Sequence, residues 1–156
     1  MKNPDYVRYE QAVKLKRLGF NWKCRYFYEC DNKVLMPLEE IVSSIEGYDF
    51  CITSDTLVED FNKQQDICSA PTIAQVQKWL REEKEIEVGV FGDFDGELPT
   101  GKWVWLMRKF NEHLFDTVFT EDDIRFNTYE EALIDGIDKT LELLKQQSNG
   151  KDKRNI

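Results

Sequence analysis

Two stretches of the chain carry apolar residues at helical spacing, and a capping signal precedes each of them. The first stretch runs over residues 73–84, directly after Thr72, and the second follows Thr128. Each threonine is followed three residues later by a glutamine or a glutamate, which is the spacing of a capping box. The apolar faces comprise Ile73, Val76, Trp79 and Leu80 in the first stretch and Tyr129, Leu133, Gly136, Ile137, Thr140, Leu141 and Leu144 in the second. This pattern predicts two amphipathic helices.

Gly136 lies within the apolar face of the second predicted helix. Glycine inside a helix costs about 1 kcal/mol relative to alanine, so its presence calls for a compensating gain. We expect the helix backbone to approach a neighbouring element closely at this point. An alanine at position 136 is therefore expected to overpack the contact and to destabilise the protein.

A third helix is predicted near the N-terminus. Asn3 is the expected N-cap and Pro4 the first helical residue, where the missing N–H of proline costs nothing. Gly19 is the expected C-cap, because glycine adopts the left-handed conformation without steric cost.

Alternating apolar and polar residues predict strands between these helices. Residues 22–30 form the first predicted strand, in which Trp22, Cys24, Tyr26, Tyr28 and Cys30 fall on the face expected to be buried, and Lys23, Arg25, Phe27 and Glu29 fall on the other. A turn over residues 31–33 leads to a short return strand that begins at Val34. The remaining predicted elements are an antiparallel hairpin from 86–90 and 103–107 with a long connection, a short strand at 124–126, a helical turn or two at 38–42, and a short strand at 50–53.

The order of these elements favours helices packed against an antiparallel sheet, and it does not follow an alternating βαβ pattern. We therefore predict an α+β fold with an antiparallel sheet of about four to five strands and two or three helices packed on one face. The length of 156 residues suits one domain. We expect this single domain to cover residues 1–147, followed by a polar flexible tail over residues 148–156.

The charge of the chain is acidic but unevenly distributed. The net charge is −9, yet residues 1–33 hold eight Lys/Arg against four Asp/Glu, while residues 34–148 hold ten against 25. Proteins bind the nucleic-acid backbone through Lys and Arg that neutralise phosphates. The acidic body therefore argues against binding to generic duplex DNA.

The N-terminal residues lack the apolar core of a signal peptide, and no apolar run reaches the roughly 18 residues of a membrane span. We expect a cytoplasmic protein of a bacterium that does not bind membranes. The four cysteines are expected to be free thiols in a reducing compartment. Because no pair has C-x2-C spacing and the single histidine, His113, lies far away, we expect no zinc and no cofactor.

Several short segments together carry a family resemblance. Ser69–Thr72 is followed by Gln77–Glu82, Thr128–Leu133 opens the last predicted helix, and Leu18–Phe20 ends the first one. In this combination the chain resembles a family of small uncharacterised proteins of gut bacteria and their phages or prophages. The resemblance spans most of residues 10–145. It implies a common fold but no activity, so no functional residue is transferred.

Two groups of residues are candidates for chemistry. Cys68 lies four residues before the capping threonine, and a thiol at a helix N-terminus can have a lowered pKa and act as a nucleophile. A buried structural cysteine is the favoured reading of this position. Glu131, Asp135, Asp138 and Glu142 follow one helical surface, which could hold a metal or serve acid–base chemistry but is more typical of a solvated face.

Two further segments are candidates for binding. Asp93–Glu97 superficially resembles part of a calcium loop, but Val104 occupies the position of the last ligand, which favours a solvated hairpin loop. Lys23, Arg25 and Phe27 belong to a basic, aromatic segment that could form a surface for single-stranded nucleic acid or for a protein partner. An ordinary amphipathic strand explains the same pattern.

The motifs favour binding over catalysis. We expect an accessory protein of a mobile element or its host that acts by binding another protein or itself, because aromatic residues and strong charge suit recognition. One alternative is a protein linked to nucleic acid through the basic N-terminal third. The other is a small enzyme that uses Cys68 or a carboxylate pair.

Overall fold

The computed structural model describes residues 5–38, 61–63, 65–110, 115–119 and 124–152. The predicted strand at 50–53, nearly all of the predicted helical turn at 38–42, and His113 lie outside the described residues. Contacts along the chain divide it into two compact units, Met1–Thr72 and Ile73–Ile156, where the sequence predicts one domain.

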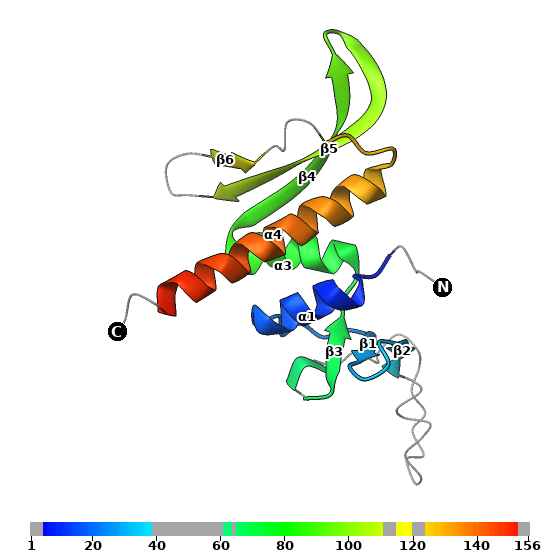
Figure 1. The fold of residues 1–156 in the computed structure, drawn as a ribbon, viewed down its shortest axis with the longest axis vertical. Coiled ribbons are helices and arrows are strands. Elements are labelled where there is room, and N and C mark those ends of the chain that lie inside the picture. Colours follow the sequence, from blue (N-terminus) through cyan, green and yellow to red (C-terminus); the bar gives the residue numbers. More distant parts are fainter. Residues whose placement is uncertain (1–4, 39–60, 64, 111–114, 120–123, 153–156) are drawn as a thin grey trace. The chain divides into compact units, whose positions relative to one another are not determined.

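The described residues of the first unit form helix α1 and an antiparallel sheet with the strand order β2-β1-β3 (Figure 1). Helix α1 contacts β3. The elements are α1 (Tyr9–Arg17), β1 (Tyr26–Glu29), β2 (Leu35–Pro37), the short 3-10 helix η1 (Phe61–Lys63) and β3 (Ile67–Ala70). The predicted return strand after Val34 is therefore confirmed as β2.

The part of the second unit that the structure describes forms helices α3 and α4 and an antiparallel sheet with the strand order β4-β5-β6. Both helices contact β4. The elements are α3 (Ile73–Lys84), β4 (Ile86–Asp95), β5 (Leu98–Phe110), β6 (Phe115–Phe119) and α4 (Tyr129–Asp152). The α+β class is confirmed, but two three-stranded sheets replace the single larger sheet that was predicted.

Helix α1 begins later than the sequence predicts. The helix starts at Tyr9, because the chain before it is extended: Tyr6 forms an isolated bridge with Thr72, and the Val7 N–H donates to the Pro71 carbonyl at 3.1 Å. These backbone bonds outweigh the local start signal at Asn3 and Pro4. The predicted end is confirmed, since Gly19 has a φ of +83°.

The predicted placement of Phe27 on the exposed face of β1 is wrong, whereas Cys24 is buried and Lys23 and Arg25 are exposed as predicted. Phe27, assigned to the exposed face, is 1% exposed, whereas Tyr26 and Tyr28 on the opposite face are half-buried. Both faces of this strand are covered, so alternation alone does not identify the more buried one. The tyrosines remain near the boundary because their hydroxyls need partners, and the Tyr28 hydroxyl donates to the Val7 carbonyl at 2.8 Å.

The hairpin of the second unit is much longer than predicted. Pairing runs from Ile86 opposite Lys109 to Asp95 opposite Leu98, so the predicted long connection is instead a two-residue turn at Gly96 and Glu97. Gly96 has a φ of +63°, as a type II′ turn requires at its first central residue.

The predicted strand at 124–126 is reduced to a single bridge between Trp103 and Phe126. Strand β6 was not predicted.

Gly136 makes the close contact that its position predicts. A Cβ added there would lie 2.9 Å from Cγ of Trp105 on β5 and 3.0 Å from Cγ1 of Val88 on β4. The Trp105 ring is fixed in turn, because its Nε1 donates to Asp135 Oδ2 at 2.9 Å. The expected backbone approach between α4 and the sheet is confirmed.

The start of α4 also follows its prediction. The Glu131 N–H donates to Thr128 Oγ1 at 3.1 Å, and the Glu131 carboxylate accepts from the Asn127 N–H at 3.2 Å. The helix continues to Asp152, so the first part of the predicted flexible tail at 148–156 is helical. Within the described residues no helix is long and apolar enough to span a membrane.

Candidate functional site

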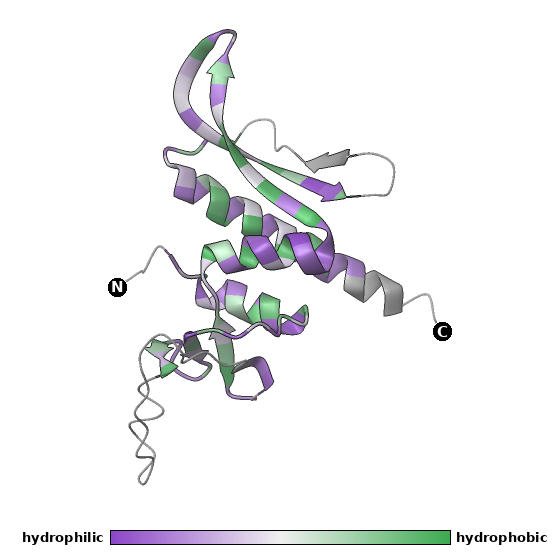
Figure 2. Ribbon diagram, turned by 180° about the vertical axis from the view of Figure 1, so that it is seen from behind, coloured by the Kyte–Doolittle hydropathy of each residue, from purple (hydrophilic) through white to green (hydrophobic). Residues whose placement is uncertain are grey.

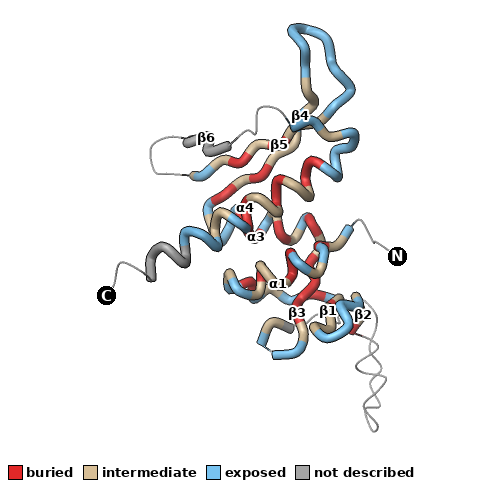
Figure 3. Tube along the Cα trace, viewed as in Figure 1, coloured by how far each residue is buried: buried red, intermediate tan, exposed pale blue. Residues whose placement is uncertain are grey.

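The outer part of the β4–β5 ribbon carries the most exposed apolar side chains of the second unit. We call residues 91–102 the distal hairpin. Phe91, Phe94 and Leu98 are 48%, 62% and 74% exposed, respectively. In Figures 1 and 3 the ribbon extends away from α3 and α4, and its outer end is exposed along both strands. Figure 2 shows hydrophobic and hydrophilic residues interspersed along it.

Each exposed phenylalanine ring lies over a glycine of its own strand. A Cβ added to Gly89 would lie 3.1 Å from Cε2 of Phe91, and a Cβ added to Gly92 would lie 3.8 Å from Cε2 of Phe94. An aromatic ring that covers a strand glycine shields the backbone and supports the strand. The two rings are therefore held against their own strand although a large part of each surface is exposed.

A bulge interrupts the pairing of the two strands within the distal hairpin. Gly92 pairs with Trp103, but the next pair along is Phe94 with Pro99, so Asp93 faces residues 100–102. Gly101 has a φ of +72°, which glycine adopts at little cost.

Asp93 fixes the geometry of this bulge. Its Oδ2 accepts from Thr100 Oγ1 at 2.9 Å, and its Oδ1 lies 2.9 Å from Nε of Arg125. The Asp93 side chain is only 15% exposed, so this ion pair is partly shielded from water. Asp93–Glu97, which superficially resembles part of a calcium loop, therefore belongs to a paired β-ribbon. The first carboxylate of this segment, that of Asp93, forms an ion pair with the guanidinium of Arg125.

The tip of the distal hairpin is acidic. Asp95 and Glu97 flank the turn and are exposed. The nearest basic residue along the ribbon, Lys102, donates from Nζ to Asn127 Oδ1 at 2.6 Å. The tip therefore combines exposed apolar side chains with negative charge.

The predicted basic surface of the first unit is not assembled as expected. Lys23 and Arg25 are exposed, but Phe27 between β2 and β3 is almost completely buried. A buried ring cannot stack on a base or contact a partner. The three residues therefore do not form one surface, although the two basic residues are accessible.

Cys68 does not have the environment of a solvent-accessible nucleophile with a lowered pKa. It lies on β3, is 2% exposed, and its Sγ lies 3.6 Å from Sγ of Cys30. Burial and the hydrogen bond with Cys30 raise the pKa of Cys68 to about 11, and the nearby Lys16 and Arg17 lower it only in part. Cys68 is therefore a buried cysteine, as the favoured reading of the sequence expects, and desolvation of the thiolate opposes the lowered pKa of the nucleophile reading.

The carboxylates along α4 serve different structural roles. Asp135 accepts from the indole of Trp105, and Glu131 caps the helix start. Glu142 is exposed and Asp138 is half-buried. In the part of the chain that the structure describes, no group of three or more His, Cys, Asp or Glu side chains is placed to hold a metal ion.

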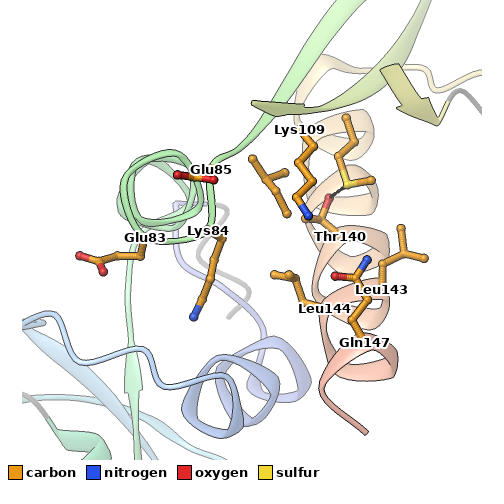
Figure 4. A pocket seen from close by; sticks show the side chains of 10 residues that line it. Glu83, Lys84, Glu85, Lys109, Thr140, Leu143, Leu144 and Gln147 are labelled. Atoms are coloured by element: carbon orange, nitrogen blue, oxygen red, sulfur yellow. Dashed lines mark hydrogen bonds between the residues drawn. The ribbon is translucent and has the colours of Figure 1, made fainter. Parts of the chain in front are cut away.

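A cavity of about 250 Å³ lies within the second unit, bordered by the end of α3, the start of β4, β5 and the second half of α4 (Figure 4). The lining residues are Glu83, Lys84, Glu85, Ile86, Met107, Lys109, Thr140, Leu143, Leu144 and Gln147. The Thr140 hydroxyl donates to the Gly136 carbonyl at 2.7 Å, and Thr140 Oγ1 lies 3.3 Å from Met107 Sδ. The cavity therefore offers apolar walls and charged borders but no reactive hydroxyl.

Comparisons with protein-family models, with curated proteins and with solved structures found no match.

The distal hairpin was missed because its residues resemble a loop. Glycine, aspartate and proline are depleted in strands, and residues 92–101 are rich in them. One signal was present: the sequence Gly89-Val90-Phe91-Gly92-Asp93-Phe94 repeats a glycine followed two residues later by phenylalanine. That repeat matches the observed placement of each ring over the preceding glycine.

Proposed function

We propose that this protein acts by binding another protein and that the distal hairpin is its binding element. The observation that carries the proposal is the exposure of Phe91, Phe94 and Leu98 on a ribbon whose base is fixed by the bulge at Asp93. Exposed aromatic and aliphatic side chains at a fixed position are typical of protein interfaces. A pre-positioned element also loses less conformational entropy when it binds.

The side chains of the distal hairpin suggest the chemistry of the partner. Phe91 and Phe94 lie three residues apart on one strand and so project from opposite faces of the ribbon. A cleft that receives the ribbon would bury both rings, whereas a flat surface would bury one. Asp95 and Glu97 at the tip favour Lys and Arg at the border of that cleft.

A partner other than a second copy of this chain agrees better with the charges. The chain has a net charge of −9, and two hairpin tips that met would place four carboxylates near one another. The proposed partner is therefore a protein with an apolar cleft bordered by basic residues. As part of the same proposal, the protein is an accessory factor of a mobile element or its host.

Site-specific photo-crosslinking tests the proposal. A photoreactive phenylalanine analogue is placed at Phe94 or at Leu98, and the matched control carries it at Val34, which is 48% exposed in the first unit. We expect one cross-linked protein from both hairpin positions and none from the control. The product is expected to diminish in the double variant Asp95→Asn/Glu97→Gln and to weaken as salt increases.

Three outcomes would contradict the proposal. Equal cross-linking from Val34 and from the hairpin would show nonspecific capture. A product that is insensitive both to salt and to the loss of Asp95 and Glu97 would contradict a basic partner. A cross-linked dimer of the chain, together with a doubled mass in solution, would replace the proposed partner with self-association.

A further inference from the structure

Cys30 and Cys68 form a pair of thiols in direct contact within the first unit. Their sulfur atoms lie 3.6 Å apart although the residues are 38 positions apart in the sequence. Cys30 is half-buried, whereas Cys68 is 2% exposed. One thiol is therefore accessible to a small reagent, and the other is shielded behind it.

The backbone holds the two cysteines in this arrangement. In the β1–β3 register Tyr28 is opposite Cys68, and Cys30 follows two residues later on the same face. The Cys30 N–H donates to the Asp66 carbonyl at 2.9 Å, and the Cys30 carbonyl accepts from the Tyr9 hydroxyl at 3.3 Å. The chain is thus fixed on both sides of Cys30, so the contact between the sulfurs follows from strand pairing.

We propose that Cys30 and Cys68 form a reversible disulfide when the protein encounters hydrogen peroxide, which makes this pair an oxidation site. A disulfide has an S–S distance of about 2.05 Å, so the sulfur atoms must approach by roughly 1.5 Å. Cys30 is a diagonal neighbour of Cys68 just past the end of β1, so closure of the bridge needs side-chain rotation and a small backbone shift at Cys30 but no change of the β1–β3 register. The proposed oxidation site uses no residue of the distal hairpin and does not depend on the proposed protein partner.

The chemistry balances in two steps. The Cys30 thiolate attacks one peroxide oxygen, the O–O bond breaks, and Cys30 becomes a sulfenic acid while hydroxide leaves and takes a proton to form water. The Cys68 sulfur then attacks the Cys30 sulfur, the S–O bond breaks, and the departing hydroxide takes the Cys68 proton as a second water. Two thiols are oxidised to one disulfide, and one peroxide is reduced to two waters.

Peptide mapping of the full-length protein tests the site. The reduced protein is treated with hydrogen peroxide, its remaining thiols are alkylated, and its peptides are identified by mass spectrometry. We expect the titratable thiols to fall from four to two, a linked peptide that contains Cys30 and Cys68, and full recovery with dithiothreitol. The midpoint of thermal unfolding is expected to rise by about 5–10 °C on oxidation, because the bridge closes a long loop.

Matched variants separate this site from general oxidation. In Cys68→Ala, the sulfenic acid on Cys30 has no partner and should be trapped by dimedone, whereas wild type should give little adduct. Cys24→Ala is the control, since Cys24 is 0% exposed, and it should form the same bridge as wild type. Peroxide-treated wild type without the linked peptide would overturn the proposal, as would equal dimedone labelling of Cys30 in wild type and Cys68→Ala.

Discussion

The β4–β5 ribbon has two halves that share one pair of strands but differ in their surroundings. In the inner half, Val88, Trp105 and Met107 are at most 5% exposed, and α4 lies against them at Gly136. In the outer half, Phe94 and Leu98 are 62% and 74% exposed. Both halves are rich in aromatic and aliphatic residues, so composition does not explain the difference.

The two halves are stabilised by different means. The inner half is held by burial of apolar surface against a helix, which contributes roughly 25 cal/mol per Å². The outer half is held by the pairing of its two strands and by the Asp93–Arg125 ion pair at the bulge, and the Phe91 and Phe94 rings lie over Gly89 and Gly92 with much of their surface exposed. A ribbon can therefore remain paired beyond the core, and its apolar side chains are left available for a partner.

The largest loss of stability is expected when the Trp105 ring, at the centre of the inner half, is removed. Trp105→Ala should lower the free energy of unfolding by about 3–5 kcal/mol, because it leaves a cavity beneath α4. Urea denaturation measures this change. Trp105→Phe, which keeps a ring but loses the bond to Asp135, should cost clearly less. A loss in Trp105→Ala no larger than that of Phe94→Ala would remove the distinction between the halves.

The next largest effect concerns the contact between α4 and the sheet. Gly136→Ala gains about 1 kcal/mol of helix propensity, but its Cβ would overlap the Trp105 ring. We expect a net loss of about 1–2 kcal/mol in the free energy of unfolding, measured from denaturant midpoints. Gln146→Ala on the exposed part of the same helix should change it by less than about 0.5 kcal/mol. A more stable Gly136→Ala protein would contradict the close approach.

Removal of the Asp93 carboxylate, which fixes the bulge of the outer half, should lower the free energy of unfolding by a smaller amount. Asp93→Ala removes the ion pair with Arg125 and the bond from Thr100, and it should cost about 1 kcal/mol. Limited proteolysis should show faster cleavage within residues 91–102 while the rest of the second unit remains resistant. Asp93→Asn retains an acceptor for Thr100 and should lie between wild type and Asp93→Ala. Unchanged cleavage in Asp93→Ala would show that the bulge is stable without its carboxylate.

The smallest effect on stability is expected at the tip. Phe94→Ala should change the free energy of unfolding by less than about 0.5 kcal/mol, because its ring is mostly exposed in the folded state. Thermal and urea unfolding both measure this quantity. A loss comparable to that of Gly136→Ala would mean that the ring is needed to hold the ribbon and is not simply available to a partner.

The sequence was most informative where the signals are local. The helix at Ile73–Lys84 has the predicted bounds, because a capping threonine and apolar residues at helical spacing act within a few turns. Gly136 was also informative, since a glycine in an apolar helical face costs stability unless something packs closely on it. The α+β class follows from the order of such local elements.

The distal hairpin and the thiol pair could not be derived in this way. Pairing of residues 92–101 depends on Arg125, which lies far along the chain from Asp93. The contact between Cys30 and Cys68 depends on the β1–β3 register, which joins segments 38 residues apart. Phe27 was placed on the wrong face because both sides of β1 are covered, and alternation carries information only when one side faces water.

The bond between Gln77 and β4 has a consequence for solubility. Strand β4 lies at the edge of its sheet, and an edge strand presents unpaired backbone groups to which a strand of another molecule can add. Gln77 Nε2 of α3 donates to the Val88 carbonyl at 3.0 Å and so occupies one of these groups. The side chain thereby hinders edge-to-edge association of neighbouring molecules. Its loss would be seen first as turbidity or fibrils in a concentrated solution, while the unfolding midpoint changed little.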